Sequence, residues 1–229
     1  MKTVGLRRPM RSLFKGVAAG ALGVLSLCAN AEGVRRNEAE LVLRRSEPHG
    51  PSAAELRSLP PYCKVRLTQG TNRKNPEVTK WIRALGPSYV DIHHYCIGLN
   101  LLNRANNTFG GSKQDLAHKL RGAIGNFDYV LDRASPGFAL LPEIHLNRAR
   151  AFRKGGRPHD AATDLDRALE LKPDYAAGYA ELSDLYRQTG EHDRARKVLE
   201  QGLAMKPESR ALRIRLVKLS QTTSNPKTF

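Results

Sequence analysis

The C-terminal half of the chain repeats itself. Residues 142–175 and 176–209 align without a gap, and small residues, aromatic residues, glycine and proline recur at the same positions of both segments. Repeats of roughly 20–50 residues are supersecondary units that stack on their neighbours, because one unit cannot bury its apolar face alone. The repeat therefore predicts a stack of similar units and not a domain built around one central core.

Each unit has the residues of two helices joined by a tight turn. Gly156 and Gly190 stand where the first helix would end, and glycine readily adopts the positive φ of such a turn. Pro173 and Pro207 follow the second helix, which proline cannot continue. Small residues let the helices approach closely, and aromatic residues fill the space between turns. The small residues are Ala149, Ala161, Ser183 and Ala195, and the aromatic residues are Phe152 and Tyr186.

This pattern resembles the tetratricopeptide repeat (TPR). The signature positions of the second copy hold Tyr179, Leu182, Ser183, Tyr186, Gly190, Ala195, Leu199 and Pro207. Those of the first copy hold Ala149, Phe152, Gly156, Ala161, Leu165, Ala168 and Pro173. Three residues depart from the pattern: His145 and Arg148 replace Trp and Leu, and Gly202 replaces Ala. The resemblance implies an all-α fold, a short solenoid of helical hairpins.

A third, degenerate repeat is expected upstream, because a stable stack usually needs three units. Residues 123–138 can be laid over 161–175, which predicts a second helix over residues 116–134. Its first helix would hold Gly98 at the small-residue position, with Leu101 or Leu102 near the aromatic position. The polar stretch between them, residues 103–115, is predicted to be an elongated turn with an insertion of roughly a dozen residues.

The remaining segments complete the predicted domain layout. Residues 62–141 form an N-terminal helical segment that includes the degenerate repeat, and residues 210–220 form a capping helix with Leu212, Leu216 and Leu219 on one face. Residues 32–61 are expected to be a mostly disordered linker with at most one short helix from Ser52, and residues 221–229 a disordered tail.

A further short helix is expected to open at Asn75, where an N-cap residue is followed by proline and an acid. Its apolar stripe of Val78, Trp81, Ile82 and Leu85 would dock on the first repeat.

The N-terminus has the three parts of a secretory signal peptide. Five basic residues without an acid precede an apolar run over residues 16–28, and small residues at 29–31 offer a cleavage site. An uncleaved anchor is the alternative, although the run is shorter than the roughly 20 residues of a membrane span. We expect export, to the periplasm or fully secreted. Removal of residues 1–31, with Cys28, lowers the formal net charge from +16 to +11.

Two cysteines remain in the mature chain, Cys63 and Cys96. In an oxidising compartment, an even pair predicts a disulfide. Cys96 lies in the stretch "DIHHYCIGLN", so a metal site or a cysteine–histidine nucleophile with His93 and His94 is the competing interpretation. A closed metal site needs about four ligands, and a nucleophile needs an exposed thiolate, whereas this stretch is apolar almost all round.

The resemblance also implies where a partner would bind. TPR arrays present the first helix of each hairpin on a concave groove that holds peptide segments of other proteins. The register assigns the groove to Asn147, Arg150, Lys154, Asp184, Arg187, Arg215 and Lys218. Such a cationic groove would take an acidic or carboxylate-bearing segment. The competing interpretation is that these are solvated charges on an outer face.

The expected function is a non-catalytic adaptor of the cell envelope that binds a protein or peptide, with no cofactor and no nucleic-acid partner. A binder of anionic envelope polymers or lipid surfaces is the alternative, because the net charge stays positive after removal of the signal. The sequence shows no Ser/His/Asp arrangement, phosphate loop or paired-acid motif that favours an enzyme.

Overall fold

The computed structural model describes residues 50–108 and 110–224, and every regular element in them is a helix. All of these residues fall within one compact unit, residues 42–229. The all-α fold class predicted from the repeat is confirmed. The predicted signal peptide, with Cys28, and the linker up to residue 49 lie outside the described residues. No helix of the described part of the chain is both long enough and apolar enough to span a bilayer.

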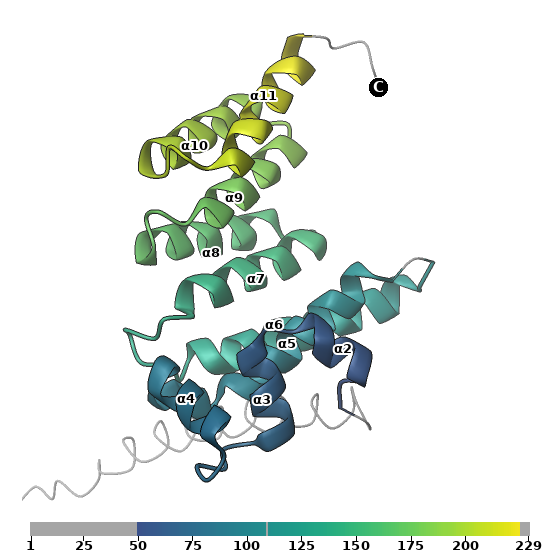
Figure 1. Ribbon diagram of the computed structural model, residues 1–229. Coiled ribbons are helices and arrows are strands. Elements are labelled where there is room, and N and C mark those ends of the chain that lie inside the picture. The colour runs from purple at the N-terminus through teal and green to yellow at the C-terminus, as the bar shows by residue number, and fades with distance from the viewer. Residues whose placement is uncertain (1–49, 109, 225–229) are drawn as a thin grey trace, which may run out of the picture. The chain divides into compact units, whose positions relative to one another are not determined.

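The two clear repeats are helical hairpins, stacked one after the other (Figure 1). The first consists of α7 (Leu141–Lys154) and α8 (Pro158–Leu171), and the second of α9 (Ala176–Gln188) and α10 (His192–Met205). α11 (Arg210–Ser224) packs on α9 and α10 and closes the stack. α11 runs four residues beyond the predicted capping helix, so the disordered tail predicted from residue 221 is wrong for residues 221–224.

The degenerate repeat consists of α5 (Ile92–Asn106) and α6 (Lys113–Leu131), which lie side by side. Its connection spans only residues 107–112, so the elongated turn predicted over 103–115 is wrong. The extra residues lengthen both helices, because the buried side chains of Leu102 and Ala105 continue the apolar face of α5. Gly98 is needed here, since a Cβ atom would lie 2.7 Å from the ring of Phe127.

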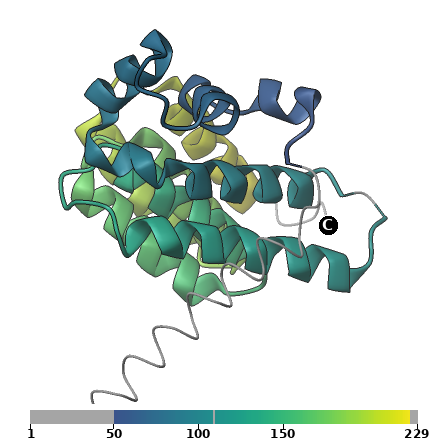
Figure 2. The same ribbon diagram turned by 90° about the horizontal axis from the view of Figure 1, so that it is seen from below.

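Within residues 50–91, four short elements precede this repeat: α2 (Ala53–Ser58), α3 (Pro61–Gln69), α4 (Pro76–Leu85) and the 3-10 turn η1 (Pro87–Val90). The side chain of Ser52 caps α2, and that of Asn75 caps α4 by accepting from the backbone N–H of Glu77. α3 lies against α5, on the side away from α6 (Figure 2). α4 packs on α3 and η1, and its apolar stripe belongs to the same core cluster as the buried residues of α5 and α6.

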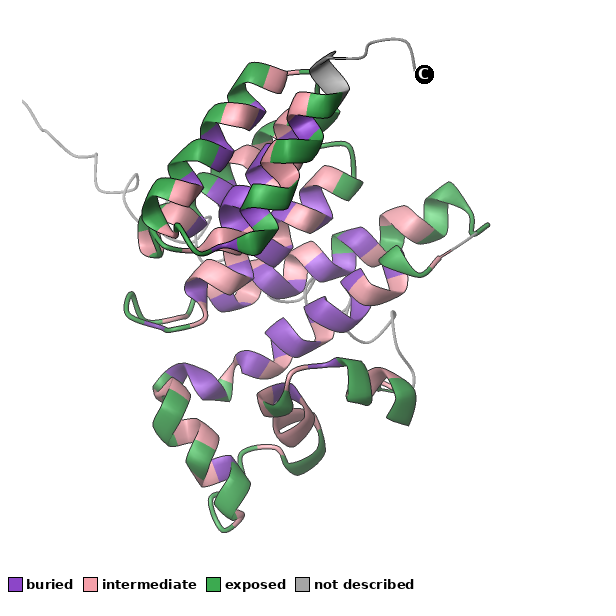
Figure 3. Cartoon of the chain, turned by 45° about the horizontal axis from the view of Figure 1, so that its top comes forward, coloured by how far each residue is buried: buried purple, intermediate pink, exposed green. Residues whose placement is uncertain are grey.

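The apolar core consists of two clusters that meet at α7. One cluster joins the N-terminal helices to α5 and α6 and includes Ile144, whereas the other joins the two clear repeats to α11 and includes Phe152. Figure 3 shows the buried residues along the faces where helices meet and the exposed residues on the outer faces. α7 therefore carries side chains of both clusters.

A disulfide between Cys63 of α3 and Cys96 of α5 ties the N-terminal helices to the degenerate repeat. The Cα atoms of the two cysteines are 5.4 Å apart, and both residues are fully buried. Because its sulfur is bonded, Cys96 has no thiolate to offer as a nucleophile.

Two of the three departures from the TPR pattern belong to a partly buried ionic cluster around the buried Asp164. Arg148 donates to both carboxylate oxygens of Asp164 at 2.7 Å and to Asp128 at 2.6 Å, and His145 lies 2.8 Å from Asp164. Burial opposes the charge of Asp164, but Arg148 and then His145 hold the pKa of its carboxyl below the ordinary value. The cluster links α6, α7 and α8 through charges where other repeats use apolar packing.

The third departure, Gly202, makes room for a neighbouring ring. A Cβ atom at this position would lie 2.7 Å from the ring of Tyr179 and 2.9 Å from Leu212. Alanine, which the pattern prefers, would not fit here without movement of α9 or α11. The turn glycines behave as predicted, with φ of 74° at Gly156 and 83° at Gly190.

Candidate binding groove

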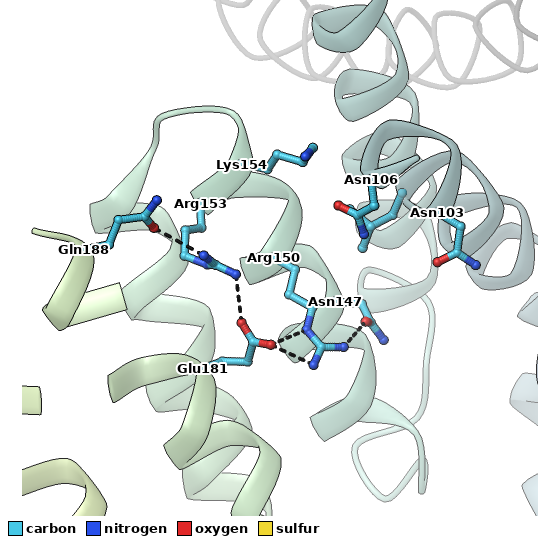
Figure 4. Close-up of a pocket in the computed structure, with 9 residues that line it drawn as sticks. Asn103, Asn106, Asn147, Arg150, Arg153, Lys154, Glu181 and Gln188 are labelled. Carbon is cyan, nitrogen blue, oxygen red and sulfur yellow. Dashed lines mark hydrogen bonds and ion pairs between the residues drawn. The ribbon is translucent and has the colours of Figure 1, made fainter. Parts of the chain in front are cut away.

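The first helices of all three hairpins line one pocket of about 450 Å³ (Figure 4). Its lining is mainly polar and comes from α5, α7 and α9. The residues are Leu102, Asn103, Asn106, Asn147, Arg150, Arg153, Lys154, Glu181 and Gln188. Below, this is the α7 pocket. Three predicted groove residues, Asn147, Arg150 and Lys154, line it.

A second pocket of about 410 Å³ lies between α9 and α11 and is called the α11 pocket. It is lined by Ser183, Asp184, Arg187, Ile214, Arg215, Lys218 and Leu219. The other four predicted groove residues, Asp184, Arg187, Arg215 and Lys218, line this pocket. The structure thus distributes the seven predicted residues over two adjoining pockets that share α9.

Glu181 holds two arginines of the α7 pocket in place. Its carboxylate accepts from Nε of Arg150 at 2.7 Å and from Nη2 of Arg153 at 3.2 Å, so it lies between the two guanidinium groups (Figure 4). Arg153 also donates to Gln188 at 3.2 Å. A guanidinium fixed in this way keeps its orientation without a ligand, which lowers the entropic cost of binding one.

Asn147 supports Arg150 and has no donor left for a ligand. Its side-chain NH₂ group donates to the hydroxyl of Tyr95 at 2.9 Å and to the backbone carbonyl of Glu143 at 3.0 Å. Its carbonyl oxygen accepts from Nη1 of Arg150 at 3.1 Å. The amide has two N–H donors, and both are used. The structure therefore makes Asn147 a positioning residue, only 6% exposed, and not the ligand contact expected from the register.

A partly buried cluster of two tyrosines and Glu143 lies next to Asn147. The hydroxyl groups of Tyr62 and Tyr95 donate to the same oxygen of Glu143, at 3.1 and 2.7 Å. Burial, and next the Glu143 carboxylate, raises the pKa of Tyr95 well above its ordinary value. The same two causes raise the pKa of Tyr175 to about 12. These phenols therefore stay neutral donors at physiological pH.

Three lining residues of the α7 pocket remain uncommitted. Within residues 50–108 and 110–221, the side chains of Asn103, Asn106 and Lys154 have no hydrogen bond or ion pair with the protein. Asn106 and Lys154 are exposed, and Asn103 is half-buried. They offer two amides and one ammonium group beside the fixed arginines, a set of donors suited to a carboxylate.

In the α11 pocket, Asp184 has the role that Glu181 has in the α7 pocket. Its carboxylate accepts from Nε of Arg215 at 3.2 Å, and Nε of Arg187 lies 3.9 Å away. Each pocket therefore combines three cationic side chains with one carboxylate. The arginines that the register assigned to a groove are ion-paired and not merely solvated.

Sequence reasoning missed Arg153, Glu181, Gln188, Asn103 and Asn106. Arg153 was identifiable, because it follows Arg150 by three residues and shares its helix face. The two asparagines were assigned to a turn that the structure shows as helix. Glu181 and Gln188 gave no sequence signal, because their role depends on contacts with a helix about 30 residues away.

The histidines of "DIHHYCIGLN" are engaged with protein groups. Nδ1 of His94 lies 3.0 Å from the amide oxygen of Asn126, and its ring stacks on Tyr129 with centroids 3.7 Å apart. Nδ1 of His93 lies 3.0 Å from Nη2 of Arg66 and 3.1 Å from the carbonyl of Val90. The part of the chain that the structure describes contains no cluster of three or more metal-ligating side chains.

The hairpins, their turn glycines and the small-residue contacts define a TPR-type repeat fold. Residues 152–218 match the family model described as tetratricopeptide repeat. A thermophilic TPR protein of Thermus thermophilus has a similar crystal structure, with a TM-score of 0.53 and 20% identity over 86% of this chain and 96% of that one. Residues 152–218 therefore resemble tetratricopeptide repeats in sequence, and the hairpins have the TPR-type fold.

Two curated proteins are also similar to part of the chain. The Hsp70-Hsp90 organizing protein of Triticum aestivum is 31% identical over 107 residues, and the STIP1 homolog of Dictyostelium discoideum is 30% identical over 108 residues. These matches cover 45% and 46% of this chain, but only 18% of each relative. The chain thus spans less than a fifth of the length of these relatives.

Proposed function

We propose that this protein is a non-catalytic interaction module that holds an acidic, carboxylate-bearing segment of a partner protein in the α7 pocket. The observation that carries the proposal is the set of uncommitted donors, Asn103, Asn106 and Lys154, beside two arginines held by Glu181. Three cations against one carboxylate give the pocket a positive balance, and arginine suits the planar geometry of a carboxylate.

The similarity to curated relatives supports this class of function. The name of the wheat relative describes an organizer of Hsp70 and Hsp90, and the similarity to it extends over 107 residues. An organizer of other proteins works by binding them. We carry over only this general role, the binding of partner proteins, because most of the relative lies outside the match.

The place of action that we propose is the cell envelope, with export to the periplasm or beyond. The sequence pattern of residues 1–31 supports it. A buried disulfide between Cys63 and Cys96 is also typical of proteins in oxidising compartments.

The test uses two charge reversals of the same size. Lys154→Glu changes the α7 pocket, and Lys197→Glu changes an exposed position of α10, outside both pockets. The probe is a fluorescein-labelled seven-residue peptide that ends in two acidic residues and a free carboxylate. A second peptide has asparagine, glutamine and a terminal amide instead. Fluorescence anisotropy at about 0.15 M salt measures the affinity of each pair.

We expect Lys154→Glu to weaken binding of the acidic peptide at least tenfold and Lys197→Glu to weaken it less than twofold. The neutral peptide should not bind measurably. Equal weakening by both variants would instead favour the alternative function, a binder of anionic polymers or lipids driven by the positive net charge, which is +11 after removal of residues 1–31. That alternative also predicts binding to vesicles rich in phosphatidylglycerol, with a steep loss of affinity as salt increases.

A further inference from the structure

The two pockets are neighbours on one helix. Glu181 of the α7 pocket and Asp184 of the α11 pocket are three residues apart on α9, and residues at this spacing share a helix face. α9 packs on α7 on one side and on α11 on the other. A segment that leaves the α7 pocket across α9 therefore arrives at the α11 pocket.

The α11 pocket differs from the α7 pocket in having an exposed apolar wall. Ile214 is aliphatic, lines the pocket and is 43% exposed. Leu219 also lines the pocket and is buried. In the α7 pocket Leu102 is the one apolar lining residue, and it is nearly fully buried. Covering Ile214 with a side chain of a partner would remove apolar surface from water, which is favourable at roughly 25 cal/mol per Å².

The charges beside this wall select the neighbouring residue of the partner. Arg187 is 56% exposed and Arg215 is 37% exposed, and both contact the single carboxylate of Asp184. Two arginines against one carboxylate give this part of the pocket an excess of positive charge. An acidic residue next to the aliphatic one would complement this excess of positive charge.

We infer that the α11 pocket is a second subsite of the groove, and that it binds an aliphatic residue adjacent to an acidic residue in the same partner segment. This inference rests on the proposed function, since the α7 pocket supplies the first anchor. Neighbouring helices pack about 8–10 Å apart, and an extended chain rises about 3.3 Å per residue. The two anchors of the partner are therefore about three residues apart, and the segment crosses α9 in an extended conformation.

The test compares two variants of α11. Ile214→Ala with Arg215→Ala removes the apolar wall and one cation of the α11 pocket. The matched control is Val217→Ala with Arg213→Ala, which removes an aliphatic side chain and an arginine from exposed positions of α11 that line neither the α7 pocket nor the α11 pocket. Circular dichroism verifies that both variants keep their helicity.

The probes are labelled nine-residue peptides with an acidic pair and a leucine–aspartate pair about three residues apart, made in both orders. In matched peptides, alanine–asparagine replaces leucine–aspartate. In the unchanged protein and in the control variant, this replacement should weaken peptide binding about tenfold for one of the two orders of the pairs. In the α11-pocket variant, it should weaken binding less than twofold.

The outcomes separate the two proposals. If the acidic pair binds but the leucine–aspartate pair never matters, or matters equally in the α11-pocket variant, the second subsite is refuted and the α7 pocket stands. If no acidic peptide binds to the unchanged protein, the proposed function fails, and the second subsite fails with it.

Discussion

The hydroxyl group of Tyr62 donates a hydrogen bond to Glu143 across 3.1 Å, and this contact joins α3 to α7. Glu143 also accepts from Tyr95, whose hydroxyl accepts from Asn147, the residue that orients Arg150. The helices before the repeats are therefore part of the support of the α7 pocket and not only a covering of its end.

Removal of one hydroxyl group tests this support. We expect Tyr62→Phe to lower the free energy of unfolding by about 1 kcal/mol, because Glu143 loses one of its two tyrosine donors. Binding of the acidic peptide should weaken only slightly, since Tyr95 still holds Glu143 and Asn147. Urea denaturation measures the first effect. Tyr129→Phe, which removes a hydroxyl outside this network, serves as the control and should change stability less.

Reduction of the disulfide is expected to lower the free energy of unfolding substantially. Closing a loop with a sequence separation of 33 residues stabilises a fold by roughly 3–4 kcal/mol on the chain-entropy estimate. Thiol titration of the denatured protein should find the two thiols of Cys63 and Cys96 only after reduction. Two free thiols before reduction would contradict both the disulfide and the oxidising compartment.

The ionic cluster around Arg148 should be costly to break. Arg148→Ala leaves the buried carboxylate of Asp164 without its main partner. We expect the free energy of unfolding to fall by about 3 kcal/mol, because a buried charge that loses its partner is costly. Arg167→Ala is the matched control, because Arg167 pairs with Glu170 on the exposed side of α8 and should contribute at most about 0.5 kcal/mol. Comparable losses from both variants, measured by urea denaturation, would refute a structural role of the cluster.

The fold was largely predictable from sequence because its signals are local. Repeat period, turn glycines and terminal prolines depend on residues close in the chain, and they located both clear hairpins. The turn predicted over residues 103–115 was too long, because asparagine and glycine are common in turns. In the structure, the buried side chains of Leu102 and Ala105 continue the helix instead.

The candidate site was predictable only in part. The register found cationic residues on α7, α9 and α11, but Arg150 pairs with Glu181 of the next hairpin, and Arg215 pairs with Asp184 of α9. The pairing of Arg150 with Glu181 and the loss of free donors at Asn147 depend on such contacts, which no spacing within one repeat encodes.

Gly202 gives a prediction that opposes the TPR pattern. Alanine is normally favoured over glycine within a helix by about 1 kcal/mol. At this position we expect Gly202→Ala to destabilise the protein by about 1–3 kcal/mol, because the new methyl group meets the ring of Tyr179 and overpacks the core. Gly125→Ala in α6 is the control, since its Cβ meets no atom within 4 Å, and it should be neutral or stabilising. Thermal unfolding of both variants compares them directly.

The last prediction concerns His93 and acid. Burial, then His94 and Arg66, lowers the pKa of His93 from 6.5 to about 4, so the folded state favours the neutral ring. Its contribution to stability is thus complete above pH 6.5 and declines as the pH falls towards 4, because the unfolded chain binds the proton first. Since His93 is partly exposed, we expect a loss on the order of 1 kcal/mol between pH 7.5 and 5. His93→Gln should reduce this loss in urea denaturation, whereas the same change at the exposed His118 should not; equal losses in both variants would refute the assignment.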